Sequence, residues 1–160
     1  MNDKRYRKNV GLIVLNKNNQ LLICKRKDKS AWQFPQGGID VGEKNLHAAY
    51  RELFEEVGIN KHQVKVIARS KHWYYYDIPR EYKPRPKSLE NFSGQKQKWY
   101  LLKAKGELKI NLSNQIPQEF IDYEWSSYWF ALTNVVPFKQ EVYRNVLLEF
   151  LPKYINIHDN

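Results

Sequence analysis

The chain has 160 residues, of which 42% are hydrophobic, and this is the size of one domain with its own core. Its longest apolar run near the N-terminus, residues 10–15, is too short for a membrane span or a signal-peptide core. The single cysteine, Cys24, excludes an intramolecular disulfide. We therefore expect one cytoplasmic domain over residues 1–160, with Cys24 as a packed thiol.

The formal net charge of +10 is unevenly distributed. Residues 1–29 carry 9 Lys and Arg against 2 Asp and Glu, and residues 60–110 carry 13 against 4. Residues 37–59 instead carry 2 basic against 5 acidic side chains. An acidic centre between basic flanks is typical of a metal site that receives a polyanion, although ordinary surface lysines give the same count.

Two strands are predicted at the start of the chain, over residues 9–15 and 20–26, with an Asn-rich turn between them. Arg7 lies just before the first strand and Arg26 ends the second. Guanidinium groups bind phosphate oxygens through two hydrogen bonds at once, so both arginines are candidate phosphate ligands.

An extended run over residues 32–36 leads into Gly37 and Gly38, and an amphipathic helix follows within residues 37–59. Gly58 is the left-handed residue that ends such a helix. One face of the helix is apolar and consists of Leu46, Ala49, Tyr50, Leu53 and Val57.

Three carboxylates, Glu52, Glu55 and Glu56, share another face of this helix. Each like-charged pair at this spacing costs a few tenths of a kcal/mol, so a cation at this face would relieve the repulsion. Clustered oxygen ligands suit Mg²⁺, and also Mn²⁺. The alternative is a solvated acidic face.

The second half of the chain reads as short strands and one further helix. Residues 79–93 form a loop, and Glu119 lies in another loop. Along one strand, Lys96 and Lys98 lie on one face and Gln95 and Gln97 on the other. The strands are expected at 63–69, 72–78, 95–104, 107–110 and 123–129, the helix at 142–151, and a frayed tail at 155–160. This pattern predicts an α+β or α/β/α sandwich.

Residues 37–59 resemble the Nudix box without a departure. The matching positions are Gly37, Glu43, Arg51-Glu52-Leu53, Glu55-Glu56 and Gly58-Ile59. The wider sequence is similar to the bacterial RNA pyrophosphohydrolases within that family. The supporting stretches are 6–11, 32–38, 94–99, 127–129 and 135–139. The resemblance implies the Nudix fold, a mixed sheet between helices.

The resemblance also implies a metal site. Its ligands would be the carbonyl of Gly37 and the carboxylates of Glu52, Glu55, Glu56 and Glu119, all four of which we also take as catalytic. Asp122 and Glu124 are close enough in sequence to compete with Glu119. Glu43 would pair with Arg51 and support the site. The expected cofactor is a divalent metal, Mg²⁺ or else Mn²⁺, which would neutralise phosphate charge and activate water.

On the same grounds, the expected reaction is removal of pyrophosphate from the 5′-triphosphate of RNA, which leaves a 5′-monophosphate and promotes RNA decay. The expected substrate-binding residues are Arg7, Arg26, Tyr76, Gln95, Gln97, Phe138 and Lys139. The alternatives are a dinucleoside polyphosphate hydrolase that acts on diadenosine polyphosphates, and a non-catalytic RNA-binding adaptor with the same fold. No membrane or DNA partner is expected.

Overall fold

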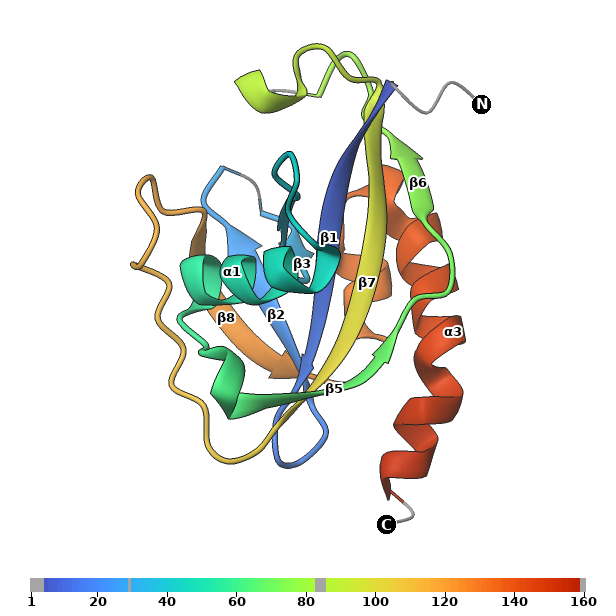
Figure 1. The fold of residues 1–160 in the computed structure, drawn as a ribbon. Coiled ribbons are helices and arrows are strands. Elements are labelled where there is room, and N and C mark those ends of the chain that lie inside the picture. Colours follow the sequence, from blue (N-terminus) through green and yellow to red (C-terminus); the bar gives the residue numbers. More distant parts are fainter. Residues whose placement is uncertain (1–4, 29, 83–85, 159–160) are drawn as a thin grey trace.

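The computed structural model describes residues 5–28, 30–82 and 86–158. A mixed β-sheet forms the middle layer of the fold (Figure 1). Helix α1 (Asn45–Val57) covers one face, and α3 (Gln140–His158) covers the other together with the short α2 (Phe130–Asn134). The predicted α+β sandwich is therefore confirmed.

The sheet is built around β1, which pairs with β2, β4 and β7. Strand β7 also pairs with β5 and β6, and β2 pairs with β3 and β8. The strands are β1 (Tyr6–Leu15), β2 (Leu21–Arg26), β3 (Trp32–Gln33), β4 (Gln36–Gly38), β5 (Val64–Arg69), β6 (Tyr74–Asp77), β7 (Gly94–Ala104) and β8 (Phe120–Ser126).

Strands β1 and β7 are parallel over their length, whereas the other pairs are antiparallel. The β1–β4 pairing sets Asn9 opposite Gly38 and Val10 opposite Gly37. The glycine pair is thereby fixed to the central strand, directly before the helix that carries the acidic cluster.

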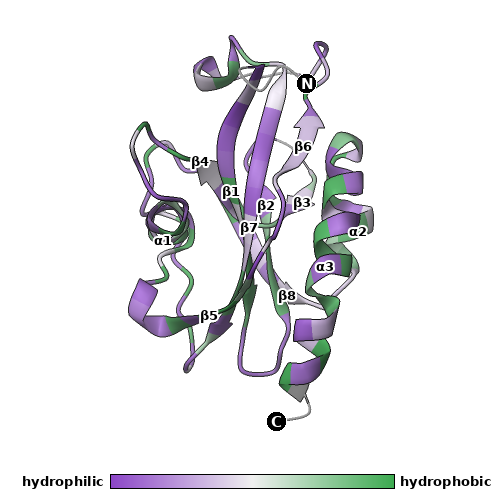
Figure 2. Cartoon of the chain, turned by 45° about the vertical axis from the view of Figure 1, so that its right-hand side comes forward, coloured by the Kyte–Doolittle hydropathy of each residue, from purple (hydrophilic) through white to green (hydrophobic). Residues whose placement is uncertain are grey.

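Each face of the sheet has its own hydrophobic core, because successive strand residues point to opposite sides. On the α3 face, Ile13, Trp99 and Leu101 pack with Tyr143 and Phe150. On the α1 face, the core comprises Val10, Leu12, Val14, Tyr100 and Leu102 from the strands and Ala49, Leu53 and Val57 from the helix. The two helical layers lie on opposite sides of the sheet in Figure 2.

Helix α1 ends as its sequence predicts. Gly58 has φ +72°, and its N–H donates to the carbonyl of Phe54 at 2.9 Å. Ile59 is fully buried directly after this cap. The predicted apolar face is inside, with Ala49, Leu53 and Val57 fully buried.

Some predicted boundaries are wrong. Residues 107–110 form no strand; Leu108 and Ile110 instead pack against the α1-side core as irregular chain. Residues 155–158, expected to be frayed, continue α3, and Tyr154 and Ile157 pack against the core. Strand β8 spans Phe120–Ser126 rather than 123–129, and Arg7 lies inside β1. Residues 83–85 of the predicted loop, and 159–160 of the predicted tail, lie outside the described residues.

No helix among the described residues is long and apolar enough to cross a membrane. Cys24 is buried in the α1-side core, as predicted, and this burial raises the pKa of its thiol.

Candidate active site

A cavity of about 830 Å³ opens between α1, the ends of the central strands and the segment before α3. Its lining combines acidic, basic and aromatic side chains. Of the residues that the sequence singled out, the lining includes Arg7, Arg26, Gly37, Glu52, Glu56, Tyr76, Gln95, Glu119, Phe138 and Lys139.

The acidic side of the cavity consists of Glu52, Glu56 and Glu119. Glu56 is 2% exposed, and its carboxylate accepts a hydrogen bond from the N–H of Gln36 at 3.2 Å. Burial, and then the charges of Glu119 and Glu52, raise the pKa of Glu56 well above its usual value. Burial also raises the pKa of Glu52, to about 7, and the pKa of Glu119. These groups are thus crowded and poorly solvated.

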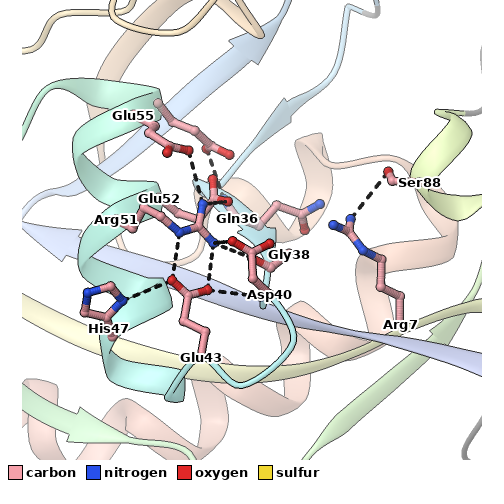
Figure 3. A network of polar contacts seen from close by, with 11 residues as sticks. Arg7, Gln36, Gly38, Asp40, Glu43, His47, Arg51, Glu52, Glu55 and Ser88 are labelled. Atoms are coloured by element: carbon pink, nitrogen blue, oxygen red, sulfur yellow. Dashed lines mark hydrogen bonds and ion pairs between the residues drawn. The ribbon is translucent and has the colours of Figure 1, made fainter.

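Arg51 holds the acidic helix to the loop before it (Figure 3). Its guanidinium donates to both carboxylate oxygens of Glu43, at 2.8 and 2.9 Å, and to the carbonyl of Gly38 at 2.8 Å. It also donates to Glu52 at 2.8 Å and to Glu55 at 3.2 Å. The hydrogen bonds from Arg51, ahead of other causes, lower the pKa of Glu43 to about 2.

The two glycines of β4 allow close approach from opposite sides. A Cβ on Gly37 would lie 1.9 Å from Cδ of Glu52, and a Cβ on Gly38 would lie 2.1 Å from Nη2 of Arg7. Both substitutions would displace a functional side chain. Glycine at these positions therefore lets a carboxylate and a guanidinium rest on the backbone itself.

The donor set fits a divalent cation. Oxygen atoms surround this part of the cavity, and among the described acidic side chains Glu52 and Glu56 are buried beside Glu119. No group of three or more described Asp, Glu, His or Cys side chains is already arranged to hold an ion. Arg51 engages Glu52 and Glu55 instead. Arg51 thus occupies one oxygen of each of these two carboxylates, Oε1 of Glu52 and Oε2 of Glu55.

The basic side of the cavity is formed by Arg26, Lys139 and Arg7. Asp28 holds Arg26 through two hydrogen bonds, at 2.9 and 3.0 Å, and Glu119 lies 3.9 Å from the same guanidinium. Lys139 is buried, with Nζ 3.4 Å from Oε1 of Gln33. Its burial, and then the charge of Arg26, lower the pKa of Lys139 to about 7.

An aromatic wall lies beside these cations. Phe138 contacts Tyr76 and Tyr82, with ring centroids 5.8 and 4.9 Å apart. Gln95 donates to the hydroxyl of Tyr76 at 2.8 Å, while its side-chain oxygen is buried without a hydrogen-bond partner among the described residues. Gln95 is a lining residue of the cavity, and its bond to Tyr76 holds the aromatic wall in place from the neighbouring strand.

Two of the residues predicted to be catalytic or to bind substrate lie outside the lining of the cavity, as do the predicted supporting residues Glu43 and Arg51. Glu55 is partly exposed and paired with Arg51. Gln97 is buried, and its amide nitrogen donates to Asn9 at 2.8 Å and to Gln36 at 2.9 Å. This bond pair ties β7 to β1 and β4, so Gln97 positions the glycine turn from below. The competitors Asp122 and Glu124 are exposed on β8, away from the lining.

Sequence reasoning missed several residues of the site. Asp28 carries a visible signal, because an acid two residues after Arg26 can hold its guanidinium across a strand end. His47, to which the sequence assigned no role, lies with Nδ1 3.0 Å from Glu43. Tyr82 and Ser88 come from the loop after β6, whose path over the cavity has no sequence signal.

A family model described as NUDIX domain matches residues 5–149. The chain belongs to this family. The RNA pyrophosphohydrolase of Francisella philomiragia is 46% identical over 153 residues, covering 94% of this chain and 96% of that protein. The RNA pyrophosphohydrolase of Escherichia coli is 38% identical over 164 residues, covering 100% and 91%.

Solved structures of Nudix-like shape confirm the predicted Nudix fold. The E. coli dihydroneopterin triphosphate pyrophosphohydrolase superposes with a TM-score of 0.67 at 19% identity, covering 90% of this chain and 98% of the other. An Ap4A hydrolase binary complex from C. elegans superposes with a TM-score of 0.63 at 20% identity, with the same coverage.

Proposed function

We propose that this Nudix protein hydrolyses the 5′-triphosphate of RNA to a 5′-monophosphate with release of pyrophosphate. One observation carries the proposal: a single cavity sets buried carboxylates opposite Arg7, Arg26 and Lys139, beside an aromatic wall. The cations would bind a phosphate chain, the acidic side would support its hydrolysis, and the aromatic wall would stack on a terminal nucleoside. Relatives that match over nearly the full chain carry the name of this activity.

In this proposal, the acidic side holds the cofactor. The carboxylates of Glu52, Glu56 and Glu119, with Glu55 after release from Arg51 and the carbonyl of Gly37, would hold Mg²⁺, or Mn²⁺ in its place. When bound, such an ion neutralises phosphate charge and lowers the pKa of water. Glu43 and Arg51 keep the helix in register with the glycine turn.

The basic side binds the outer phosphates. Arg26 is fixed in direction by Asp28, so its guanidinium needs little ordering when a phosphate arrives. Lys139 is preorganised by burial, and an adjacent polyanion would favour its charged form. Reaction adds the oxygen of water to a phosphorus and breaks the bridging P–O bond, so one product leaves with that bridging oxygen.

The nucleoside would lie against Phe138, whose ring is supported by an edge-to-face contact with Tyr82. A single wall of this kind fits one terminal nucleoside of an RNA. The same groups could also act on diadenosine tetraphosphate, which is the competing substrate.

The test compares 5′-triphosphorylated RNA with diadenosine tetraphosphate at equal concentration in the presence of Mg²⁺. The expected result is a higher kcat/KM for RNA, with pyrophosphate released and a 5′-monophosphorylated product. Arg26→Lys should raise KM for RNA, since it removes the two-pronged phosphate contact. A higher kcat/KM for the dinucleotide would overturn the proposal and leave the acidic site intact.

A further inference from the structure

A second basic surface lies on β1 and β7, on the face opposite the one from which Arg7 and Gln95 line the cavity. Along β1 and β7, residues alternate between the two faces. Arg7 and Gln95 line the cavity, whereas their neighbours Lys8 and Lys96, which are register partners, lie on the other side. This is the α1 face, where Val10 joins the core two residues further on.

Three lysines converge here on one indole. The ammonium groups of Lys8, Lys96 and Lys98 lie 6.0, 5.1 and 5.5 Å from the ring centroid of Trp73. Lys98 also donates to the carbonyls of Ser70 and Lys71, at 3.4 and 3.1 Å. Lys96 is buried, at 6% exposure, whereas Lys8 is exposed and Lys98 partly exposed, so the last two carry the accessible charge of this surface.

Two tyrosines extend this surface along the same face. Tyr75 is the register partner of Lys96, and its ring meets that of Tyr6 edge to face, with centroids 5.1 Å apart. Tyr75 is 36% exposed, and Trp73 is partly exposed. Figure 2 shows hydrophilic upper ends of β1 and β7 that extend beyond α1. We call Tyr6, Lys8, Trp73, Tyr75, Lys96 and Lys98 the basic aromatic face.

The charge of this face calls for an anion. Each cation–π contact at an exposed site is weak, and the three ammonium groups repel one another. Asp77, at the rim, accepts a hydrogen bond from the hydroxyl of Tyr6 at 2.6 Å. Neither Lys8 nor Lys98 forms an ion pair with a carboxylate in the described part of the chain. A phosphate at Lys8 and Lys98 would offset the repulsion, while bases could stack on the exposed rings.

We propose that the basic aromatic face binds the single-stranded body of the RNA whose 5′ end occupies the cavity. The inference rests on the proposed function and extends it, since it names the part of the substrate that lies outside the active site. The basic side of the cavity and this face share the ends of β1 and β7, where Arg7 and Lys8 are adjacent in sequence and point to opposite sides. A flexible strand that rounds the end of β1 can reach both, whereas a rigid duplex cannot.

The experiment compares two triphosphorylated substrates, a dinucleotide and an unstructured RNA of about 16 nucleotides, the upper end of the usual site size of single-strand-binding folds. The variants are Trp73→Ala and Lys8→Ala. Trp73→Phe, which keeps a stacking ring, and Lys65→Ala, an exposed lysine on β5, are the matched controls. Folding is checked by thermal unfolding, and a labelled 5′-hydroxyl RNA measures binding that does not use the phosphate cavity.

For the long RNA, Trp73→Ala should raise KM at least about fivefold, the low end of the loss expected for one base stack. Lys8→Ala should make the salt dependence of RNA binding shallower by about 0.7 in log–log slope. KM for the dinucleotide should stay near the wild-type value in Trp73→Ala and Lys8→Ala. Trp73→Phe and Lys65→Ala should keep near wild-type KM for the long RNA. Equal effects on both substrates, or unchanged binding of the 5′-hydroxyl RNA, would overturn the inference and identify the face as structural or as a protein contact.

The design separates this inference from the function on which it rests. If neither triphosphorylated substrate is hydrolysed, the proposed function fails, and the 5′-hydroxyl RNA still decides whether the face binds RNA. If both are hydrolysed and neither Trp73→Ala nor Lys8→Ala changes the rates, the function stands and the inference fails.

Discussion

Glu52 is the position where stability and function should oppose each other most clearly. Burial raises the pKa of this carboxyl from 4.5 to about 7, and Arg51 offsets only part of that cost. At pH 8 the group is ionised in both the folded and unfolded states, and the shift corresponds to about 3 kcal/mol of destabilisation. A glutamine at this position keeps an oxygen that can accept from Nη1 of Arg51.

We therefore expect metal-free Glu52→Gln to be more stable than the wild type by about 1–3 kcal/mol at pH 8. The sign follows from the raised pKa: the folded state binds more protons than the unfolded state between pH 4.5 and about 7, so wild-type stability falls as pH rises through that range. The advantage of the variant should accordingly shrink toward pH 4. Urea unfolding in a chelator at pH 4.5, 6 and 8 measures it.

Mg²⁺ should reverse this order. An ion that binds only the folded protein stabilises it by about 2.7 kcal/mol at one hundred times its dissociation constant. The wild type should gain this stability and the variant should not, while RNA turnover by the variant should fall by about two to three orders of magnitude, as on removal of one group that stabilises transition-state charge. Glu107→Gln, at an exposed position, is the control. If Glu52→Gln is no more stable than the wild type in chelator at pH 8, the reasoning about buried repulsion is refuted.

Three further predictions concern residues around the same cavity. Lys139→Met should raise the free energy of unfolding at pH 6 by about 1–4 kcal/mol and by less at pH 9, because the cost of burying this lysine is full below its pKa of about 7 and declines as pH rises toward the unfolded value of 10.5; it should also weaken RNA binding. Urea unfolding at both pH values and RNA titration check this. Gly37→Ala should abolish turnover with little loss of helix, since its Cβ would displace the Glu52 carboxylate; activity assays and circular dichroism distinguish the two. Glu43→Gln should lower stability at pH 7 by about 1.5–3 kcal/mol, through loss of charge-assisted bonds to Arg51. Because the Glu43 pKa is lowered to about 2, that difference should disappear as pH falls from 4.5 toward 2.

The sequence predicted the parts of the site that depend on short-range periodicity. The acidic helix face, the glycine turn and the Gly58 cap are each set by residues within one or two helical turns, and all three are present. The assignment of Glu119 over Asp122 and Glu124 needed the resemblance to the Nudix family, since a loop carboxylate has no local signature.

The sequence could not predict where side chains from distant elements meet. Gln97 points to the same side of β7 as Gln95. Its side-chain amide, however, donates to the side-chain oxygens of Asn9 and Gln36, and Gln97 is not part of the cavity lining. Residues 107–110 alternate charged and apolar side chains like a strand, but Leu108 and Ile110 pack against the α1-side core from irregular chain. The continuation of α3 to residue 158 depends on packing of Tyr154 and Ile157 against the sheet, which compensates for Pro152 within the helix.

The parallel pairing of β1 with β7 has a consequence for synthesis of the protein. The Asn9–Gln97 bond joins residues 88 positions apart, so a nascent chain that already contains all of α1 still lacks the parallel partner of its central strand. Until β7 leaves the ribosome, the apolar residues of β1 have no partner on that edge. The geometry of the site is therefore acquired late and cooperatively. A fragment that ends before residue 94 should expose β1 as an unpaired, aggregation-prone strand and should have no hydrolase activity.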